Sequence, residues 1–457
     1  MPVQTKAVKL VTQIPGPRSR ALTAAKEKVI ADALSIHVPV IIREGHGALV
    51  TDVDGNVFID LAGGLGCLNV GHSHPRVVKA IQEAAANFTH TDFSVIPYES
   101  YIRLAERLTA LAPGNWPKKA VFFNSGAEAV ENGVKFARKF THKMGIIALE
   151  GAFHGRTNMA MSLTSKVKPY KSGFGPFAPE IYRVPAPYIY RRPDGMSERD
   201  YVKFCGDALE KALLTQVHPD DCAAIIFEPQ QGEGGFVPLH PDYVKRMQEI
   251  ARRNNIVLIA DEIQSGYGRT GTFFACEQLG VEPDLILVGK SIAAGLPISG
   301  VIGRKDILDA PPDSTIGGTY VGNPVACSAA NAVLDVIEEE GLVKRATELG
   351  QVFRTRFTAL ASKLEATPGS KLFIGDVRGL GAMVGVEFVK DLKTKEPAAN
   401  EVNAIMAKGI ARGVISVKCG IYGNVLRMLV PLVIPMDMLN EALDILDEAA
   451  LEVATTK

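Results

Sequence analysis

The stretch from Leu285 to Pro297 reads Leu-Ile-Leu-Val-Gly-Lys-Ser-Ile-Ala-Ala-Gly-Leu-Pro, and it gives the first indication of the fold class. Four consecutive apolar residues are typical of a short strand that is buried on both faces. The run ends in a glycine-flanked turn that carries one lysine, Lys290. We therefore expect a strand of a covered sheet with a functional lysine at its carboxyl end.

The turn looks like the end of a nucleotide-binding P-loop, but it lacks the earlier glycine of that motif. The glycine should stand five residues before the Gly-Lys pair, where this chain has Asp284, whose carboxylate would repel a phosphate. A second glycine-rich stretch, Gly64 to Asn69, has asparagine where a dinucleotide fingerprint needs its third glycine. Neither stretch predicts a nucleotide site.

Six short apolar runs alternate with longer helical patterns in the central part of the chain. The runs are Ala120–Phe123, Gly145–Leu149, Ala223–Phe227, Ile256–Ala260, Leu285–Val288 and Ser299–Ile302. Amphipathic stretches such as Glu128–Thr141 and Tyr243–Asn254 lie between several of them. Apolar strands separated by helices predict an α/β fold with a mostly parallel central sheet covered by helices.

The two ends of the chain do not follow this alternation. Towards the C-terminus an α+β pattern contains the strand candidates Val384–Phe388 and Val425–Val430. We expect a large domain over residues 76–340 and a smaller α+β domain over residues 341–457, with the N-terminal segment 1–75 packed against the smaller one. The segment Lys168–Asp200, rich in Pro, Gly and Tyr, is expected to be a long loop.

Composition argues against several classes of function. The 50 Lys and Arg residues balance 50 Asp and Glu residues, so no net charge attracts nucleic acid or an anionic membrane. No apolar run reaches the roughly 18 residues of a membrane span, and no secretory signal pattern is visible. Six scattered cysteines without a Cys-x-x-Cys pair predict neither a metal nor a disulfide. We expect a cytoplasmic protein without metal, nucleic-acid or membrane partners.

Chemically distinctive residues gather where the predicted strands end, and such ends surround the ligand in open α/β sheets. Asn-Ser-Gly-Ala-Glu follows Phe123, and Asp-Glu-Ile-Gln follows Ala260. Small residues at the start of a helix allow backbone N–H groups to approach an anion. Asp261 follows an unbroken apolar run, so its carboxylate needs a cationic or N–H partner.

The lysine and the aspartate end two successive predicted strands. A partly desolvated lysine loses its proton more readily, and the free amine attacks carbonyl groups. An anion cradle, a buried Asp261 and an aldehyde-capturing Lys290 together fit pyridoxal phosphate, whose enzymes use a lysine and an acidic partner for the pyridine nitrogen. Taken singly, Asp261 could be a structural ion-pair partner and Lys290 a solvated side chain.

The run Asp261–Gly271, Asp-Glu-Ile-Gln-Ser-Gly-Tyr-Gly-Arg-Thr-Gly, followed by Lys290 in Gly-Lys-Ser-Ile-Ala, resembles the signature of class-III aminotransferases. These are fold-type-I pyridoxal-phosphate enzymes that work as homodimers. The resemblance extends from Asp52 to Arg427. It implies that Lys290 bonds to the cofactor's aldehyde and shuttles the proton, and that Asp261 keeps the pyridine nitrogen protonated.

The resemblance also implies further contacts to the cofactor, from Ser125, Gly126, Ala127, Phe153, Ile263 and Gln264. Backbone donors of the Ser-Gly-Ala turn would bind the phosphate, and Gln264 would approach the ring oxygen. Phe153 and Ile263 would lie on opposite faces of the ring. Thr319 resembles a residue that reaches the phosphate of the neighbouring subunit, so a homodimer, possibly paired into a tetramer, would share its active sites.

Within the family, four segments resemble the branch that transaminates 4-aminobutyrate with 2-oxoglutarate: Pro15–Arg20, Phe153–Thr157, Gln231–Gly235 and Tyr422–Arg427. This resemblance implies that Arg156 binds the distal carboxylate of either substrate and that Arg427 binds the α-carboxylate of glutamate. Glu233 would neutralise Arg427 while 4-aminobutyrate, which lacks that carboxylate, is bound. Leu65 would line the pocket or serve only as a core residue.

Several alternatives remain open at this point. Another ω-amine could be the donor, such as ornithine, acetylornithine, 5-aminovalerate or β-alanine. The same scaffold also supports amino-acid racemases and epimerases, which need no amino acceptor. A binding protein without catalytic activity would be a different class altogether, and the intact pair of Asp261 and Lys290 argues against it.

Overall fold

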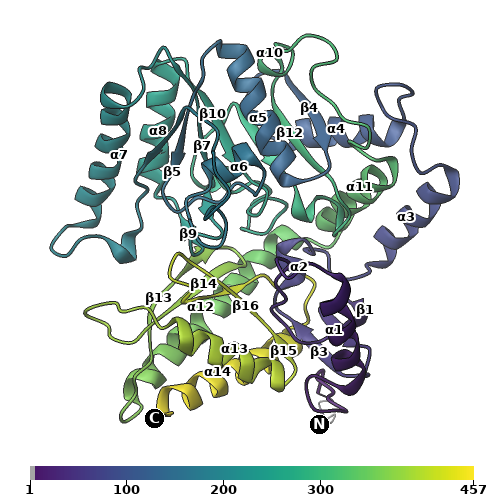
Figure 1. Cartoon of the computed structure of the whole chain (residues 1–457), viewed down its shortest axis with the longest axis vertical. Helices are drawn as coiled ribbons and strands as arrows, with labels where there is room; N and C mark the ends of the chain where they lie inside the picture. The colour runs from purple at the N-terminus through teal and green to yellow at the C-terminus, as the bar shows by residue number, and fades with distance from the viewer. Residues whose placement is uncertain (1–5, 457) are drawn as a thin grey trace.

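The structure is a computed structural model that describes residues 6–456, and its central sheet has seven strands in the order β4-β12-β11-β10-β7-β5-β6 (Figure 1). The strands are β4 Lys118–Phe123, β5 Gly145–Leu149, β6 Ile181–Val184, β7 Cys222–Phe227, β10 Val257–Asp261, β11 Leu285–Val288 and β12 Ser299–Arg304. Strand β12 runs antiparallel to both of its neighbours, whereas the remaining pairs are parallel. The predicted α/β fold with a mostly parallel sheet is confirmed.

Alternate side chains of these strands pack into two cores on opposite faces of the sheet. In β11, Leu285 and Leu287 pack into the core that contains the apolar face of α5 (Gly126–Thr141). Ile286, between them, belongs to the opposite core, which contains the apolar face of α8 (Pro241–Arg253). Burial on both faces explains why the central strands read as continuous apolar runs.

The other elements surround this sheet or form the lower part of the molecule in Figure 1. They are α1 Pro17–Val29, β1 Ile42–His46, β2 Leu49–Asp52, β3 Val57–Asp60, α2 Gly63–Gly66, α3 Pro75–Asn87, α4 Glu99–Leu111, α6 Asn158–Leu163, η1 Ile189–Arg191, α7 Glu198–Thr215, β8 Gln230–Gln231, β9 Val237–Pro238, α9 Ala275–Gln278, η2 Lys290–Ala293, α10 Lys305–Leu308, α11 Pro324–Glu339, α12 Leu342–Ala366, β13 Phe373–Leu380, β14 Met383–Val389, α13 Ala399–Ala411, β15 Val414–Ile415, β16 Val417–Cys419, β17 Val425–Met428 and α14 Met436–Thr455.

The segment Lys168–Asp200 is not all loop, and the expectation was wrong there. It contains β6, the short turn η1 and the first residues of α7. Strand β6 lies at the edge of the sheet, where it pairs with β5 alone and is only partly buried. An edge strand of four residues that includes Tyr182 and Arg183 has no apolar run by which the sequence could reveal it.

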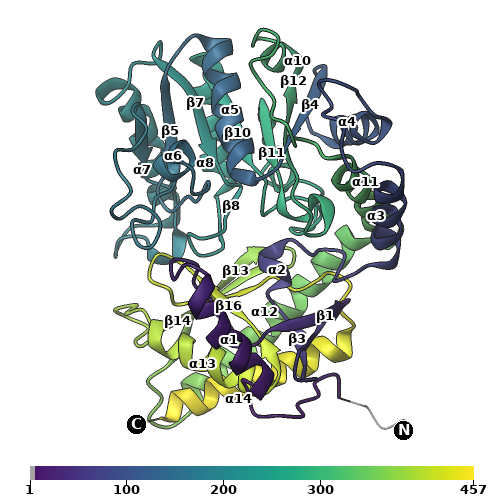
Figure 2. The same ribbon diagram turned by 45° about the vertical axis from the view of Figure 1, so that its right-hand side comes forward.

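Both ends of the chain contribute to the lower part of the molecule (Figure 2). Strands β13, β14, β17 and β16 form an antiparallel sheet in that order. A second sheet has the order β1-β2-β3-β15, so that β15, from near the C-terminus, pairs in parallel with β3, from near the N-terminus. In the part of the chain that the structure describes, no helix is both long and apolar enough to cross a membrane.

Candidate active site

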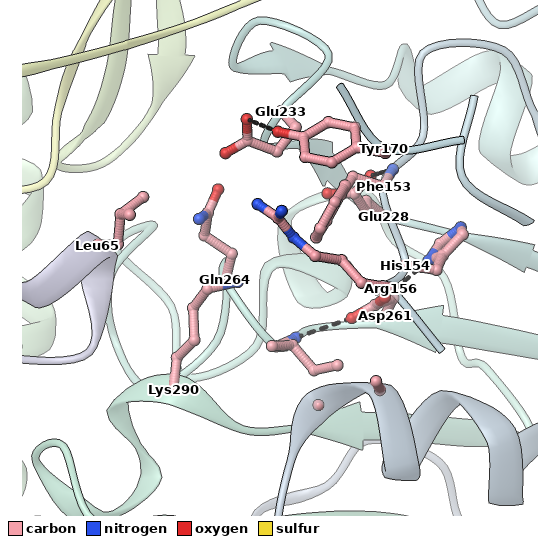
Figure 3. A pocket seen from close by; sticks show the side chains of 14 residues that line it. Leu65, Phe153, His154, Arg156, Tyr170, Glu228, Glu233, Asp261, Gln264 and Lys290 are labelled. Atoms are coloured by element: carbon pink, nitrogen blue, oxygen red, sulfur yellow. Dashed lines mark hydrogen bonds and ion pairs between the residues drawn. The ribbon is translucent and has the colours of Figure 1, made fainter. Parts of the chain in front are cut away.

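A cavity of about 300 Å³ opens at the carboxyl ends of the central strands (Figure 3). It is lined by Leu65, Gly126, Ala127, Phe153, His154, Gly155, Arg156, Tyr170, Glu228, Glu233, Asp261, Ile263, Gln264 and Lys290. Most of the residues that the sequence singled out therefore lie together. His154, Gly155, Tyr170 and Glu228 were not singled out.

Asp261 and His154 form a buried pair at the base of the cavity. Asp261 ends β10 and is 4% exposed, and its Oδ2 lies 2.7 Å from Nδ1 of the buried His154. Because an ionised carboxylate only accepts hydrogen bonds, Nδ1 is the donor. The backbone N–H of Ile263 donates to the other carboxylate oxygen at 3.2 Å. The partner of Asp261 is thus a histidine, not an arginine, and two bonds fix the orientation of its carboxylate.

Lys290 projects into the cavity from a constrained turn. It begins η2, separated from the end of β11 by one residue, and its φ of 47° lies in the left-handed region, which is unfavourable for a residue with a side chain. The next residue anchors the turn, because the Ser291 hydroxyl donates to the Gly66 carbonyl at 2.8 Å. In Figure 3 the side chains of Lys290 and Gln264 both point towards the middle of the cavity. The surrounding structure therefore sets the position of the backbone from which the lysine side chain enters the cavity.

The start of α5 offers backbone donors to an anion. The Ser125 hydroxyl accepts from the N–H of Glu128 at 3.3 Å, and the Glu128 carboxylate accepts from the N–H of Ser125 at 3.4 Å. This capping box leaves Gly126 and Ala127 lining the cavity. A Cβ on Gly126 would approach Ile263 Cδ1 to 3.0 Å, so glycine allows the close approach. Ser125 itself caps the helix and lies outside the cavity lining.

Glu228 connects the base of the cavity to the loop that carries Glu233. Its two carboxylate oxygens accept from the backbone N–H of Phe153 at 2.9 Å and from that of Gly232 at 2.8 Å. Burial raises the pKa of Glu228 to about 7. Its position directly after β7, next to the end of β5, is the signal by which the sequence could have identified it.

Glu233 and Arg427 form an ion pair beside the cavity. Arg427 lies on β17 and is 5% exposed, and its Nη1 donates to Glu233 Oε1. The hydroxyl of Tyr170 donates to Glu233 Oε2 at 3.0 Å. Burial alone would raise the pKa of Glu233, but Arg427 and Tyr170 outweigh it and lower this pKa below its usual range. The charge of Arg427 is thus neutralised within the chain.

Arg156 differs from Arg427 in having no carboxylate partner within the described part of the chain. Among residues 6–456, no acidic side chain lies within 4.0 Å of its guanidinium, which is exposed to solvent. The guanidinium carbon lies 4.7 Å from the centre of the Tyr170 ring, in a cation–π contact. The Tyr170 ring in turn packs edge-on against Phe153 at 4.9 Å. Arg156 is therefore oriented by aromatic packing and is free to bind an acid.

The loop that carries Glu233 is attached to the lower part of the molecule. Arg378, on β13, donates to the Gly235 carbonyl through Nε at 3.0 Å and Nη2 at 2.6 Å. The N–H of Gly420 donates to the Glu233 carbonyl at 3.0 Å. Arg378 is itself paired with the buried Glu387 at 2.7 Å. These bonds fix the backbone of the loop, whereas the Glu233 side chain is held only by Arg427 and Tyr170 among the described residues.

Two further predicted residues lie at the periphery. Leu65 lines the cavity from the α2 turn, where its φ is 62°, and is 40% exposed. Thr319 lies in an exposed loop and is outside the cavity lining. Within one chain, the structure does not bring Thr319 together with the other predicted site residues.

Comparison with known proteins gives consistent matches. The family model described as "Aminotransferase class-III" matches residues 30–450. A probable 4-aminobutyrate aminotransferase of Bacillus subtilis is 50% identical, over 88% of this chain and 91% of that protein. A 5-aminovalerate aminotransferase of Pseudomonas aeruginosa is 44% identical, over 91% and 94%. The ornithine aminotransferase structure from Toxoplasma gondii has a TM-score of 0.81 at 31% identity, over 97% and 96%.

Proposed function

The chain belongs to the class-III aminotransferases, and from that membership we propose that it transfers the amino group of 4-aminobutyrate to 2-oxoglutarate, giving succinate semialdehyde and glutamate. The observation that carries this choice is the pair of arginines. Arg156 has no acidic partner among the residues that the structure describes, whereas Arg427 is neutralised by Glu233. Such a site suits a monocarboxylate and a dicarboxylate in turn.

Class-III aminotransferases depend on pyridoxal phosphate, and the cavity fits that cofactor. Backbone donors at the start of α5 suit its phosphate, and the buried Asp261 suits its pyridine nitrogen. Gln264 would approach the ring oxygen, with Phe153 and Ile263 on the two ring faces. When bound, pyridoxal phosphate supplies an aldehyde that captures amines and a ring that withdraws electrons from the substrate carbon.

Lys290 and Asp261 would perform the proton chemistry. The Nζ of Lys290 would take the proton that leaves the amine-bearing carbon of the substrate and pass it to the cofactor instead of back to that carbon. Asp261 stabilises a proton on the pyridine nitrogen, and His154 keeps its carboxylate oriented for that contact. Both groups lie at strand ends whose backbone positions are fixed by the sheet.

The substrate carboxylates would be divided between the two arginines. Arg156 binds the carboxylate that 4-aminobutyrate and glutamate share, through two parallel hydrogen bonds. Glutamate brings a second carboxylate, which displaces Glu233 from Arg427. When 4-aminobutyrate is bound, Glu233 stays in place, so that Arg427 is never left buried without a counter-charge.

A second donor, 5-aminovalerate, is favoured by the relative from P. aeruginosa. It also carries one carboxylate and is one methylene longer than 4-aminobutyrate. The arrangement of Arg156, Glu233 and Arg427 would serve either amine, and the space beside Leu65 would decide between them.

We propose further that two copies of the chain form a homodimer in which Thr319 reaches the partner's site. Support comes from exposed apolar side chains around the Thr319 loop and the neighbouring loop 88–97: Phe88, Val95, Ile96 and Tyr320. These loops touch, because the His90 and Tyr320 rings lie 5.4 Å apart. Mixing Thr319→Ala with Lys290→Ala chains tests this arrangement, since a mixed dimer would combine both lesions in one site and leave the other intact.

The working compartment is proposed to be the cytoplasm. The six cysteines are all unpaired, and Cys205, Cys222, Cys276, Cys327 and Cys419 are buried. Buried free thiols suit a reducing compartment.

The proposed reaction is tested by a panel of amines assayed with 2-oxoglutarate, following glutamate formation. We expect the highest kcat/KM for 4-aminobutyrate, a lower value for 5-aminovalerate and much lower values for ornithine, acetylornithine and β-alanine. A higher value for any other amine would overturn the choice of substrate. Conversion of an amino acid to its mirror image without any oxo acid would instead indicate a racemase.

A further inference from the structure

Tyr170 touches both places in the cavity that we propose for substrate carboxylates. Its hydroxyl donates to Glu233 Oε2 at 3.0 Å, and Glu233 uses its other oxygen to pair with Arg427. The face of its ring lies 4.7 Å from the Arg156 guanidinium carbon. In Figure 3 the hydroxyl points to Glu233 while the ring lies beside Phe153. Tyr170 thus contacts Arg156 directly and Arg427 through Glu233.

We propose that Tyr170 is a positioning residue that biases the site towards acids with a single carboxylate, because its hydroxyl retains Glu233 on Arg427. The inference rests on the proposed function and extends it to the segment between α6 and β6. The ring and the hydroxyl have separate tasks. The ring supports Arg156, which binds the carboxylate common to both substrates, whereas the hydroxyl acts only on Glu233.

The two kinds of acid make different demands on this hydrogen bond. A dicarboxylate must displace Glu233 from Arg427, and the bond from Tyr170 breaks in that movement. A monocarboxylate leaves the bond intact. Hydrogen bonds to charged groups are stronger than those between neutral groups. Removing the hydroxyl should therefore strengthen the binding of dicarboxylates and leave the binding of monocarboxylates unchanged.

Calorimetric titration of the holoenzyme with glutarate and pentanoate tests the proposal. Both acids have five carbons, and neither carries an amine or an oxo group, so neither reacts. In Tyr170→Phe we expect the dissociation constant of glutarate to fall about tenfold, as for the loss of one hydrogen bond to a charged group, and that of pentanoate to change less than twofold. Equal changes for both acids, or no change for glutarate, would overturn the proposal.

Two further variants identify the route of the effect. Tyr182→Phe removes a hydroxyl that also donates to a glutamate, Glu180, at 2.6 Å, but outside the cavity lining. The ratio of the two dissociation constants should not change in this control. In a Glu233→Ala background, Tyr170→Phe should no longer alter the ratio, because the hydroxyl has lost its acceptor. A persisting tenfold change there would show that Tyr170 acts by another route, against the proposal.

The binding assay and the amine panel can fail independently. If the glutarate-to-pentanoate ratio shifts but 4-aminobutyrate is a poor donor, the proposed substrate is wrong and the role of Tyr170 stands. If 4-aminobutyrate is the best donor but the ratio does not shift, the substrate stands and the role of Tyr170 is refuted.

Discussion

The base and the rim of the cavity are built in different ways. The base, defined here as Asp261, His154 and Lys290, lies at the ends of strands in one sheet and is fixed by buried bonds. The rim, defined as Arg156, Tyr170, Glu233 and Arg427, joins two parts of the molecule, and in the proposed function a ligand carboxylate replaces Glu233 in its ion pair. The difference indicates that chemistry common to all substrates is separated from the recognition of each substrate.

This separation has a physical basis. Groups that act on every substrate benefit from a single fixed position, which the buried sheet provides. Groups that must accept two different acids need an internal counter-charge that moves. Glu233 meets this need because Arg378 and Gly420 fix its backbone while its side chain remains partly exposed.

The largest effect should come from the base. Lys290→Ala should slow amine transfer from 4-aminobutyrate and from glutamate by the same factor, about 10⁴-fold, because the proton-transfer group is lost for both. Single-turnover absorbance measurements of each half-reaction would give the two factors. Unequal losses would show that Lys290 also takes part in substrate selection, which would contradict the separation of the base from the rim.

A smaller and one-sided effect is expected at the rim. Glu233→Ala leaves Arg427 uncompensated only when 4-aminobutyrate is bound, at a cost of about 3–5 kcal/mol. Transfer from 4-aminobutyrate should therefore slow by more than about a hundredfold, and transfer from glutamate far less. The same single-turnover assay measures both. Equal losses would contradict the replacement of Glu233 by a substrate carboxylate.

Arg156 belongs to the rim but is proposed to bind both substrates. Its variant therefore tests whether a rim residue can affect both substrates equally. Arg156→Lys keeps the charge and one hydrogen bond but loses the second, parallel one. We expect KM to rise about ten- to hundredfold for 4-aminobutyrate and for glutamate alike, the loss of one charged hydrogen bond. Arg199→Lys, on a side chain that is 94% exposed, is the matched control and should leave both KM values unchanged. A rise for one substrate alone would argue against a shared carboxylate site.

The smallest effect concerns Glu228, which bonds to the backbone next to both regions, at Phe153 beside His154 and at Gly232 beside Glu233. Burial raises its pKa from 4.5 to about 7, so between these values the folded protein retains a proton that the unfolded chain releases. The contribution of Glu228 to stability is thus complete below pH 4.5 and is lost as the pH rises through 7. Glu228→Gln should reduce the fall in Tm between pH 5.5 and 7 by about 1–2 °C, which corresponds to roughly 1–2 kcal/mol in a chain of 457 residues. Exposed Glu249→Gln is the control, and an identical pH profile in Glu228→Gln would refute the assignment.

The central sheet was predictable from the sequence because a strand that is buried on both faces appears there as a continuous apolar run. The strands β5 and β11 coincide with their apolar runs, since both faces of each are covered. Edge strand β6 has one partner strand and is partly exposed, so its sequence contains no continuous apolar run. The lysine and aspartate could be singled out because each directly follows a buried run.

Contacts between distant segments could not be predicted in this way. The partner of Asp261 is His154, which the sequence places on a different strand end, and only the packing of β5, β7 and β10 brings the two together. Tyr170 lies in an irregular segment without periodicity, so no pattern indicated its position. The role of Thr319 stays a prediction, since it concerns a second copy of the chain.

The position of Arg427 on β17 has a consequence for how such enzymes diversify. This strand belongs to the antiparallel sheet of the lower part, whereas Arg156 follows β5 of the central sheet. In the proposed function the two arginines bind the two carboxylates of glutamate, so the length of diacid that fits between them depends on how the two sheets are set against each other. Substitutions in the C-terminal third would thus change the length of acid that fits while the lysine remains unchanged. A lineage could in this way come to use longer or shorter amines without loss of its catalytic step.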